Sequence, residues 1–240
     1  MIVIKMNEKN KDRIMGIICQ SHLNHEVIEN LEINNVDLSF SDLSEMMADS
    51  MEANGVILRA STLIGGSFLD CNFESADFRN CNLEGADSVD CIFSGANFYQ
   101  ANMQYAKISV SMCIATCFDE VDFSSGELMG SSFNQATFRL ANLYEVDANQ
   151  VTFSEVDFES ANLAGGNFKG AVFINANLTE IKAIKTDFAN CDFTGANFTN
   201  GIFKGADFTG AKLENVVWKG ANVEGAKFDE NVKEQVLQKL

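Results

Sequence analysis

Large apolar residues recur at every fifth position over most of this 240-residue sequence. The register runs from Ile33 to Phe228 and has 40 positions, of which 34 hold a large apolar residue and 19 hold one of the 20 phenylalanines. Only Phe40 lies outside this register. A five-residue period fits neither the period of a helix, about 3.6 residues, nor the two-residue alternation of a strand. The chain must therefore turn once per unit and stack its turns into a solenoid.

A second register lies two residues before the first. At 36 of its 40 positions, from Leu31 to Ala226, the residue is Ala, Val, Gly, Cys, Ser or Thr. The repeating unit is therefore small-x-large-x-x, with 196–200 (Ala-Asn-Phe-Thr-Asn) as a legible copy. We expect the small and large residues to point inward and the other three to face solvent. Asn, Asp and Gly at the outward positions suit tight turns and stacked side-chain hydrogen bonds.

This unit resembles the pentapeptide repeat family, whose repeat is usually written A(D/N)LXX, and the match covers residues 31–228 without a slip. The resemblance implies an all-β fold, a right-handed quadrilateral parallel β-helix with four units per coil and ten coils. Stacked at about 4.8 Å per coil, the rod would be roughly 48 Å long. Phe118, Phe138 and Phe158 would then stack in one internal column, a structural role.

Two segments flank the repeat, and each is expected to close one end of the solenoid. Residues 1–30 form an N-terminal cap in which a short strand or arm joins a helix around 11–20, where Ile14, Ile17 and Ile18 have helical spacing. Residues 229–240 form a helix that begins with a capping box at 231–234. That helix can cap its own last coil or pack against a second chain. The resemblance implies an end-to-end homodimer, with these candidate contacts: Val232, Val236, Leu237 and Leu240.

The charge of the chain is strongly acidic and unevenly distributed. There are 34 acidic and 17 basic residues, a formal net charge of −17, which disfavours direct nucleic-acid binding. All of this excess lies within 31–163, at about one negative charge per 1.9 Å of rod, close to the roughly one per 1.7 Å of duplex DNA. The sequence predicts one acidic stripe at Asp49, Asp70, Asp87, Asp90, Glu127 and Asp147, and another on an adjacent side at Asp37, Asp77, Asp119, Glu120, Asp157 and Glu159.

No group of residues indicates catalysis, a metal site or a cofactor. The seven cysteines are odd in number and lack paired C-x-x-C spacing, and the two histidines, His22 and His25, lie outside the repeat. Cysteines at inward small positions act as small apolar residues, and Cys117 is expected to face outward; the inward set is Cys71, Cys81, Cys91 and Cys191. A filled solenoid also offers no cleft. We therefore expect a non-enzyme.

The short apolar runs and the polar N-terminal segment resemble neither a membrane span nor a secretion signal, so the sequence predicts a soluble, cytoplasmic protein. The family resemblance and the charge favour a DNA mimic that binds a bacterial type II topoisomerase, DNA gyrase or topoisomerase IV. Such a protein would protect its target from inhibitors, an antibiotic-resistance function, or modulate it. No loop interrupts the repeat, so the chain resembles the loopless gyrase-interacting members of the family.

The alternative is a protein-interaction scaffold, for example a secreted bacterial effector, that uses the rigid rod to hold a docking element. Its candidate element is the N-terminal helix or an apolar contact patch of Ile92, Met112 and Ile114, which the repeat places on one side of neighbouring coils. Scattered surface apolar residues explain that patch equally well. Likewise, a solvated acidic surface that keeps a repeat protein in solution explains the charge.

Overall fold

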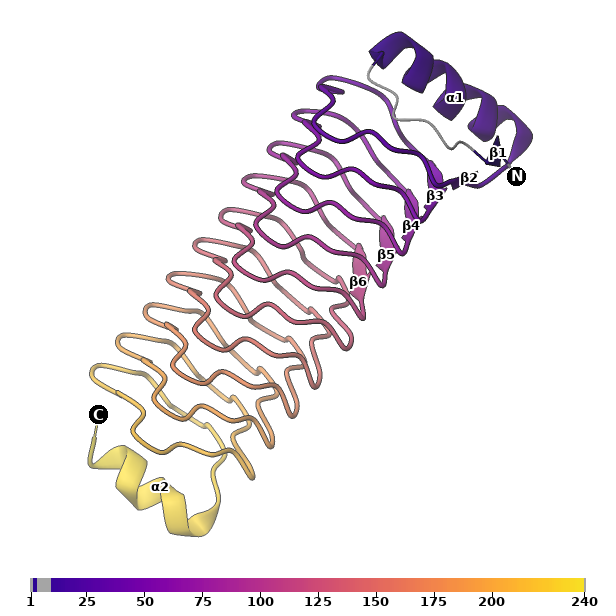
Figure 1. Ribbon diagram of the computed structural model, residues 1–240. Coiled ribbons are helices and arrows are strands. Elements are labelled where there is room, and N and C mark those ends of the chain that lie inside the picture. Colours follow the sequence, from indigo (N-terminus) through magenta and orange to yellow (C-terminus); the bar gives the residue numbers. More distant parts are fainter. Residues whose placement is uncertain (1, 4–9, 240) are drawn as a thin grey trace.

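The computed structural model describes residues 2–3 and 10–239, which form an elongated rod with a helix at each end (Figure 1). Residues twenty apart pair as parallel bridges along the rod, from Glu32 with Glu52 to Asp207 with Lys227. One coil therefore contains four five-residue units. The fold is the right-handed quadrilateral parallel β-helix that the resemblance implied.

We number the four sides of the rod in chain order, by their central inward residues. Side I runs from Ile33 to Leu213, side II from Leu38 to Trp218, side III from Leu43 to Val223 and side IV from Ala48 to Phe228. Each step along a side is twenty residues. Units that are ten residues apart consequently lie on opposite sides, so side I faces away from side III and side II away from side IV.

The interior is filled by the large residues of the register. Phe118, Phe138 and Phe158 are fully buried and stack in a column, with ring centroids 4.7 and 5.0 Å apart. Phe133 and Phe153, from the neighbouring side, meet this column with ring centroids 5.7 and 6.2 Å from Phe138. These rings thus contact rings above, below and beside them, and the aromatic part of the core continues from Phe68 to Phe228, after first coils that are packed with aliphatic residues.

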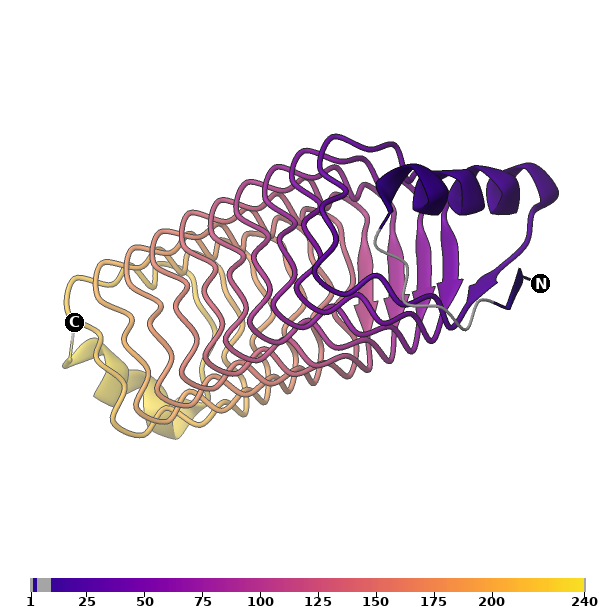
Figure 2. The same cartoon turned by 45° about the horizontal axis from the view of Figure 1, so that its top comes forward.

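The N-terminal end is closed by a helix and an added strand. α1 (Lys11–Asn24) lies across the first coil (Figure 2) and buries Ile14 and Ile18 against it. Its N-cap, Asn10, accepts a hydrogen bond from the backbone N–H of Arg13. One parallel sheet runs along side IV in the order β1 (Ile2–Val3), β2 (Ile28–Glu29), β3 (Met47–Asp49), β4 (Ser67–Leu69), β5 (Asp87–Val89) and β6 (Lys107–Ser109).

The C-terminal helix begins earlier than the sequence indicated. α2 comprises Glu230–Leu237, and its N-cap is Asp229, so the capping box predicted at 231–234 is wrong. The Asp229 carboxylate makes no cap hydrogen bond, because it accepts one from the backbone N–H of Gly210 in the coil beneath. Val236 is buried at 3% exposure, which anchors α2 on the last coil. No helix within 2–3 and 10–239 is long and apolar enough to cross a membrane.

The fifth residue of every unit forms the turn between two sides. From Asn30 to Gly225 each of these residues has a positive φ, and twelve of them are glycine, which adopts this conformation freely. Val110 has a φ of 54° and is the one β-branched residue among these turn positions in the described chain. A β-branched side chain is strained there, because its branches crowd the left-handed backbone.

We expect Val110→Asn to raise the free energy of unfolding by about 1 kcal/mol, because asparagine tolerates a positive φ. Chemical denaturation measures the change. Leu140→Asn is the matched control, since Leu140 occupies the same turn position, has a φ of 57° and shares the 62% exposure of Val110. It should stabilise the rod less, because leucine is not β-branched. A loss of stability in Val110→Asn would contradict the assignment of strain.

Candidate partner-binding surfaces

The first predicted acidic stripe lies on side IV. Its six members occupy outward positions there, with none in the coil of Lys107: Asp49, Asp70, Asp87, Asp90, Glu127 and Asp147. Glu127 and Asp147 face each other across neighbouring strands. Lys107 lies among them, with its Nζ 2.9 Å from Glu127 Oε1, and this is the one ion pair of the stripe in the described chain. Side IV therefore keeps most of its negative charge.

The second predicted stripe lies on side II, opposite side IV, so its prediction on an adjacent side is wrong. Asp77 and Asp87, for example, are ten residues apart in a twenty-residue coil, which separates them by two sides. The side II stripe comprises Asp37, Asp77, Asp119, Glu120, Asp157 and Glu159. The two stripes cannot form one continuous surface, because sides I and III lie between them.

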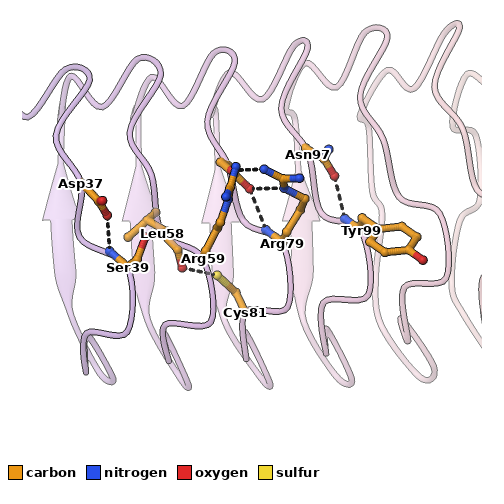
Figure 3. A network of polar contacts seen from close by, with 9 residues as sticks. Asp37, Ser39, Leu58, Arg59, Arg79, Cys81, Asn97 and Tyr99 are labelled. Atoms are coloured by element: carbon orange, nitrogen blue, oxygen red, sulfur yellow. Dashed lines mark hydrogen bonds and ion pairs between the residues drawn. The ribbon is translucent and has the colours of Figure 1, made fainter.

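Arginine residues neutralise much of the side II stripe. Asp77 Oδ2 lies 2.5 Å from Arg59 Nε and 2.7 Å from Arg79 Nη2 (Figure 3). Arg139 Nε lies 3.3 Å from Asp119 Oδ2 and 3.6 Å from Asp157 Oδ2. Each arginine joins neighbouring coils or folds back on its own unit, so side II is the least negative side of the acidic segment.

Side III carries a further acidic stripe that the sequence analysis did not single out. Its five members are Asp42, Glu45, Glu84, Asp122 and Glu145. Sorting every carboxylate by its position in the twenty-residue coil would have found it. Sides III and IV are adjacent, and Glu145 and Asp147 stand on either side of their shared corner. These two sides together form the largest continuous acidic surface of the rod, with eleven carboxylates and one lysine over residues 31–163.

The carboxylate at the centre of side III is held in its charged form. Burial acts to raise the pKa of Asp122, but hydrogen bonds from Gln104, Ser124 and Asn142 outweigh it and lower that pKa below its ordinary value. Gln104 Nε2 donates over 2.7 Å and Asn142 Nδ2 over 3.0 Å. A carboxyl group with a lowered pKa is ionised at neutral pH, so Asp122 keeps its negative charge under physiological conditions.

The predicted apolar patch lies on side I, where the sequence placed it. Ile92 and Met112 pair across neighbouring coils, and Met112 and Ile114 lie on either side of the buried Cys113. Met112 is 46% exposed and Ile114 39%, while Ile92 is half-buried. The three side chains therefore form one compact apolar surface on the outside of the rod.

The predicted dimer contacts differ from one another in accessibility. Val236 is buried within its own chain and Val232 is half-buried, whereas Leu237 is 52% exposed. Leu240 lies outside the described residues. An open groove between α2 and the last coil is lined in part by Val223, Phe228 and Leu237. A dimer through this end stays a prediction.

The inward cysteines have the surroundings of packing residues. Cys71, Cys81, Cys91 and Cys191 are buried at small inward positions, and Cys117 is half-buried at an outward one. Burial raises the pKa of the Cys81 and Cys191 thiols to about 12, which keeps them protonated and unreactive at neutral pH. Within residues 2–3 and 10–239, no three His, Cys, Asp or Glu side chains are placed to hold a metal ion.

Two family models match the chain. The one described as pentapeptide repeats (8 copies) matches residues 57–87, 71–109 and 116–154, and the one described as a pentapeptide repeat region matches residues 151–228. Together they cover more than half of the sequence. The chain belongs to the pentapeptide repeat family. No curated protein matches it.

Solved structures of other pentapeptide repeat proteins are similar to this member of the family at low identity. HetL, involved in heterocyst differentiation regulation in the cyanobacterium Nostoc sp. strain PCC 7120, is 20% identical, with 90% of this chain and 97% of HetL covered and a TM-score of 0.39. QnrB1, a plasmid-mediated fluoroquinolone resistance protein, is 16% identical, with 88% and 98% covered and a TM-score of 0.47. A protein from the Arabidopsis thaliana thylakoid lumen is 22% identical, with 49% and 72% covered and a TM-score of 0.31.

Proposed function

We propose that this pentapeptide repeat protein is a non-enzymatic DNA mimic. Its target would be the positively charged DNA-binding surface of a bacterial type II topoisomerase, DNA gyrase or topoisomerase IV, which it would protect from inhibitors or modulate. This function requires the chain to be in the cytoplasm. The observation that carries the proposal is the continuous acidic surface of sides III and IV on a rigid rod. Summed over all four sides, the acidic segment has a linear charge close to that of duplex DNA.

Two features of that surface support binding to a cationic protein groove. The coils are joined by backbone hydrogen bonds along the whole rod, so the carboxylates keep a fixed spacing and lose little freedom on binding. The surface also has few internal counter-charges: in the described chain Lys107 is the one Lys or Arg in an ion pair on sides III and IV before residue 164. Negative charge is thus available to a partner, unlike that of side II.

The test is a DNA gyrase supercoiling assay with the purified protein titrated in, with and without a fluoroquinolone, at two salt concentrations. We expect inhibition or protection from the drug that weakens as salt increases, because added ions screen an electrostatic interface. No effect at tens of micromolar protein, with folding verified by circular dichroism, would overturn the proposal.

A second function is favoured by a different observation, the apolar surface of Ile92, Met112 and Ile114 on side I. Exposed apolar groups that pair across coils are typical of sites for protein partners. In this function the rod is a scaffold, and the acidic sides serve solubility and the steering of partners. The two functions use different sides of the same rod.

A further inference from the structure

Side I lacks charge where the other sides are charged. Between Ile92 and Ser154 its outward positions hold no Asp, Glu, Lys or Arg: Ile92, Ser94, Gly95, Met112, Ile114, Ala115, Ser132, Asn134, Gln135, Thr152 and Ser154. The same coils carry carboxylates on each of the other three sides, for example Asp119, Asp122 and Glu127. A neutral strip therefore runs along an otherwise acidic rod.

The centre of this strip is apolar and continues around one corner. The backbone alternates from Val110 to Ile114, so Val110, Met112 and Ile114 face outward while the residues between them are buried. Val110, at the corner between sides IV and I, is 62% exposed. Val110 is unfavourable for folding in two ways, because its side chain is apolar in water and its backbone has a positive φ. A strained residue whose side chain stays mostly exposed gains little packing in return, and such residues cluster at functional positions.

Carboxylates border the strip. Asp90 precedes Val110 in the same corner column, Glu74 lies at the N-terminal end of the strip and Glu155 at the C-terminal end, and all three are exposed. Glu155 accepts one hydrogen bond from Gln135 Nε2, over 2.9 Å, and Glu74 accepts one from Asn54 Nδ2 over 3.4 Å. An apolar centre with an anionic rim is complementary to an apolar surface with cationic flanks.

The geometry of side I restricts which kind of partner structure can bind there. Between Glu74 and Glu155 each coil of side I is already paired with the coil above and the coil below, so this part offers no free sheet edge to an added strand. The carboxylate rim repels anionic lipid headgroups, which disfavours a membrane surface. A flat, paired side can instead receive a helix. Glu74 and Glu155 are four coils apart, about 19 Å, which is the length of about 13 helical residues.

We propose that side I between Glu74 and Glu155 is the docking site for a cationic amphipathic helix of a partner protein. The apolar face of that helix covers Ile92, Val110, Met112 and Ile114 where it crosses their two coils, and its Lys or Arg residues pair with Glu74, Asp90 and Glu155. The proposal rests on the scaffold function and needs no topoisomerase. It identifies Val110 as a contact residue in addition to the three apolar residues that the sequence indicated.

The test uses two synthetic peptides of about 14 residues with one composition of Leu, Ala and Lys. In the first, Leu recurs at helical spacing so that one face is apolar and Lys flanks it; in the second, the same residues are scrambled and the two faces are mixed. Fluorescence anisotropy at about 150 mM salt measures binding to the full chain. We expect the amphipathic peptide to bind at least about tenfold more tightly than the scrambled one, because burial of its apolar face adds to the charge attraction. Equal affinities would overturn the proposal.

The site is tested by a double variant, Val110→Asn with Met112→Thr, which we expect to weaken binding of the amphipathic peptide by about tenfold. Its matched control is Leu140→Asn with Val217→Thr on other parts of the rod. Leu140 shares the turn position and exposure of Val110, and Val217, at 47%, shares the unit position of Met112. Equal effects of the two variants would also overturn the proposal. Supercoiling assays of both variants separate this result from the topoisomerase function, which uses sides III and IV.

Discussion

Phe138→Asp is expected to abolish cooperative unfolding of the rod as one unit and to lower its melting temperature by more than any surface substitution. Phe138 is fully buried, and its ring stacks 4.7 Å from that of Phe118 and 5.0 Å from that of Phe158. Removing a buried phenylalanine ring costs about 3–5 kcal/mol. The aspartate adds the cost of an unpaired charge in an apolar core. The sum is comparable to the whole stability of many domains, about 5–15 kcal/mol.

The position of Phe138 near the middle of the rod determines how the damage spreads. Each coil contacts only its neighbours, so the stability of a solenoid is the sum of its coils and the interfaces between them. A defect at the centre separates the coils before it from those after it. Circular dichroism melts should therefore show a much lower transition or two separate ones.

Two variants control this experiment. Phe138→Leu keeps an apolar side chain in the column and should cost far less. Asn197→Ala removes an outward side chain that accepts hydrogen bonds from the backbone N–H and the hydroxyl of Thr199, a loss of about 1 kcal/mol. If Phe138→Asp and Asn197→Ala melted at the same temperature, the assignment of inward and outward positions would be wrong.

The sequence was sufficient to predict a solenoid, because a large apolar residue at every fifth position is buried only if the chain turns once per unit. Four units per coil came from the resemblance to the pentapeptide repeat family, and the bridges between residues twenty apart confirm it. The Phe118–Phe138–Phe158 column was predictable for the same reason. In this chain a five-residue period determines which residues of neighbouring coils meet. Such a link between a short repeat and distant contacts is typical of solenoids and unusual in other folds.

The surfaces were less predictable, because they depend on contacts between coils. Residue numbers alone show that the two acidic stripes lie on opposite sides, because residues ten apart are half a coil apart. The prediction that the stripes lie on adjacent sides overlooked this spacing. The neutralisation of the Asp77 carboxylate could not be predicted from residue numbers. It requires the side chain of Arg59, 18 residues away, to reach across to the next coil. The Asp229 carboxylate similarly accepts a hydrogen bond from Gly210 instead of capping α2. The residues next to Asp229 in the sequence do not reveal this contact, because Gly210 belongs to the coil beneath.

Reversing three charges of side IV, with Asp87→Lys, Glu127→Lys and Asp147→Lys together, is expected to abolish any effect of the protein on DNA gyrase. The change makes the side IV surface positive, and like charges across an interface cost several kcal/mol and slow association. The three carboxylates are outward and lie in one column of side IV, with Lys107 between Asp87 and Glu127, so folding should be retained, which a circular dichroism melt verifies.

The matched control is Glu180→Lys, Glu214→Lys and Glu224→Lys, which makes the same change in net charge in the segment after residue 163. This control also breaks one ion pair, between Lys204 and Glu224, as the test variant breaks the one between Lys107 and Glu127. If binding needed only a negative protein, both triple variants would lose activity to the same degree. If it needs the surface of sides III and IV, the control keeps most of its activity while the test variant loses it. Equal loss in the two variants would refute a specific site, because the remaining attraction would then depend on net charge alone.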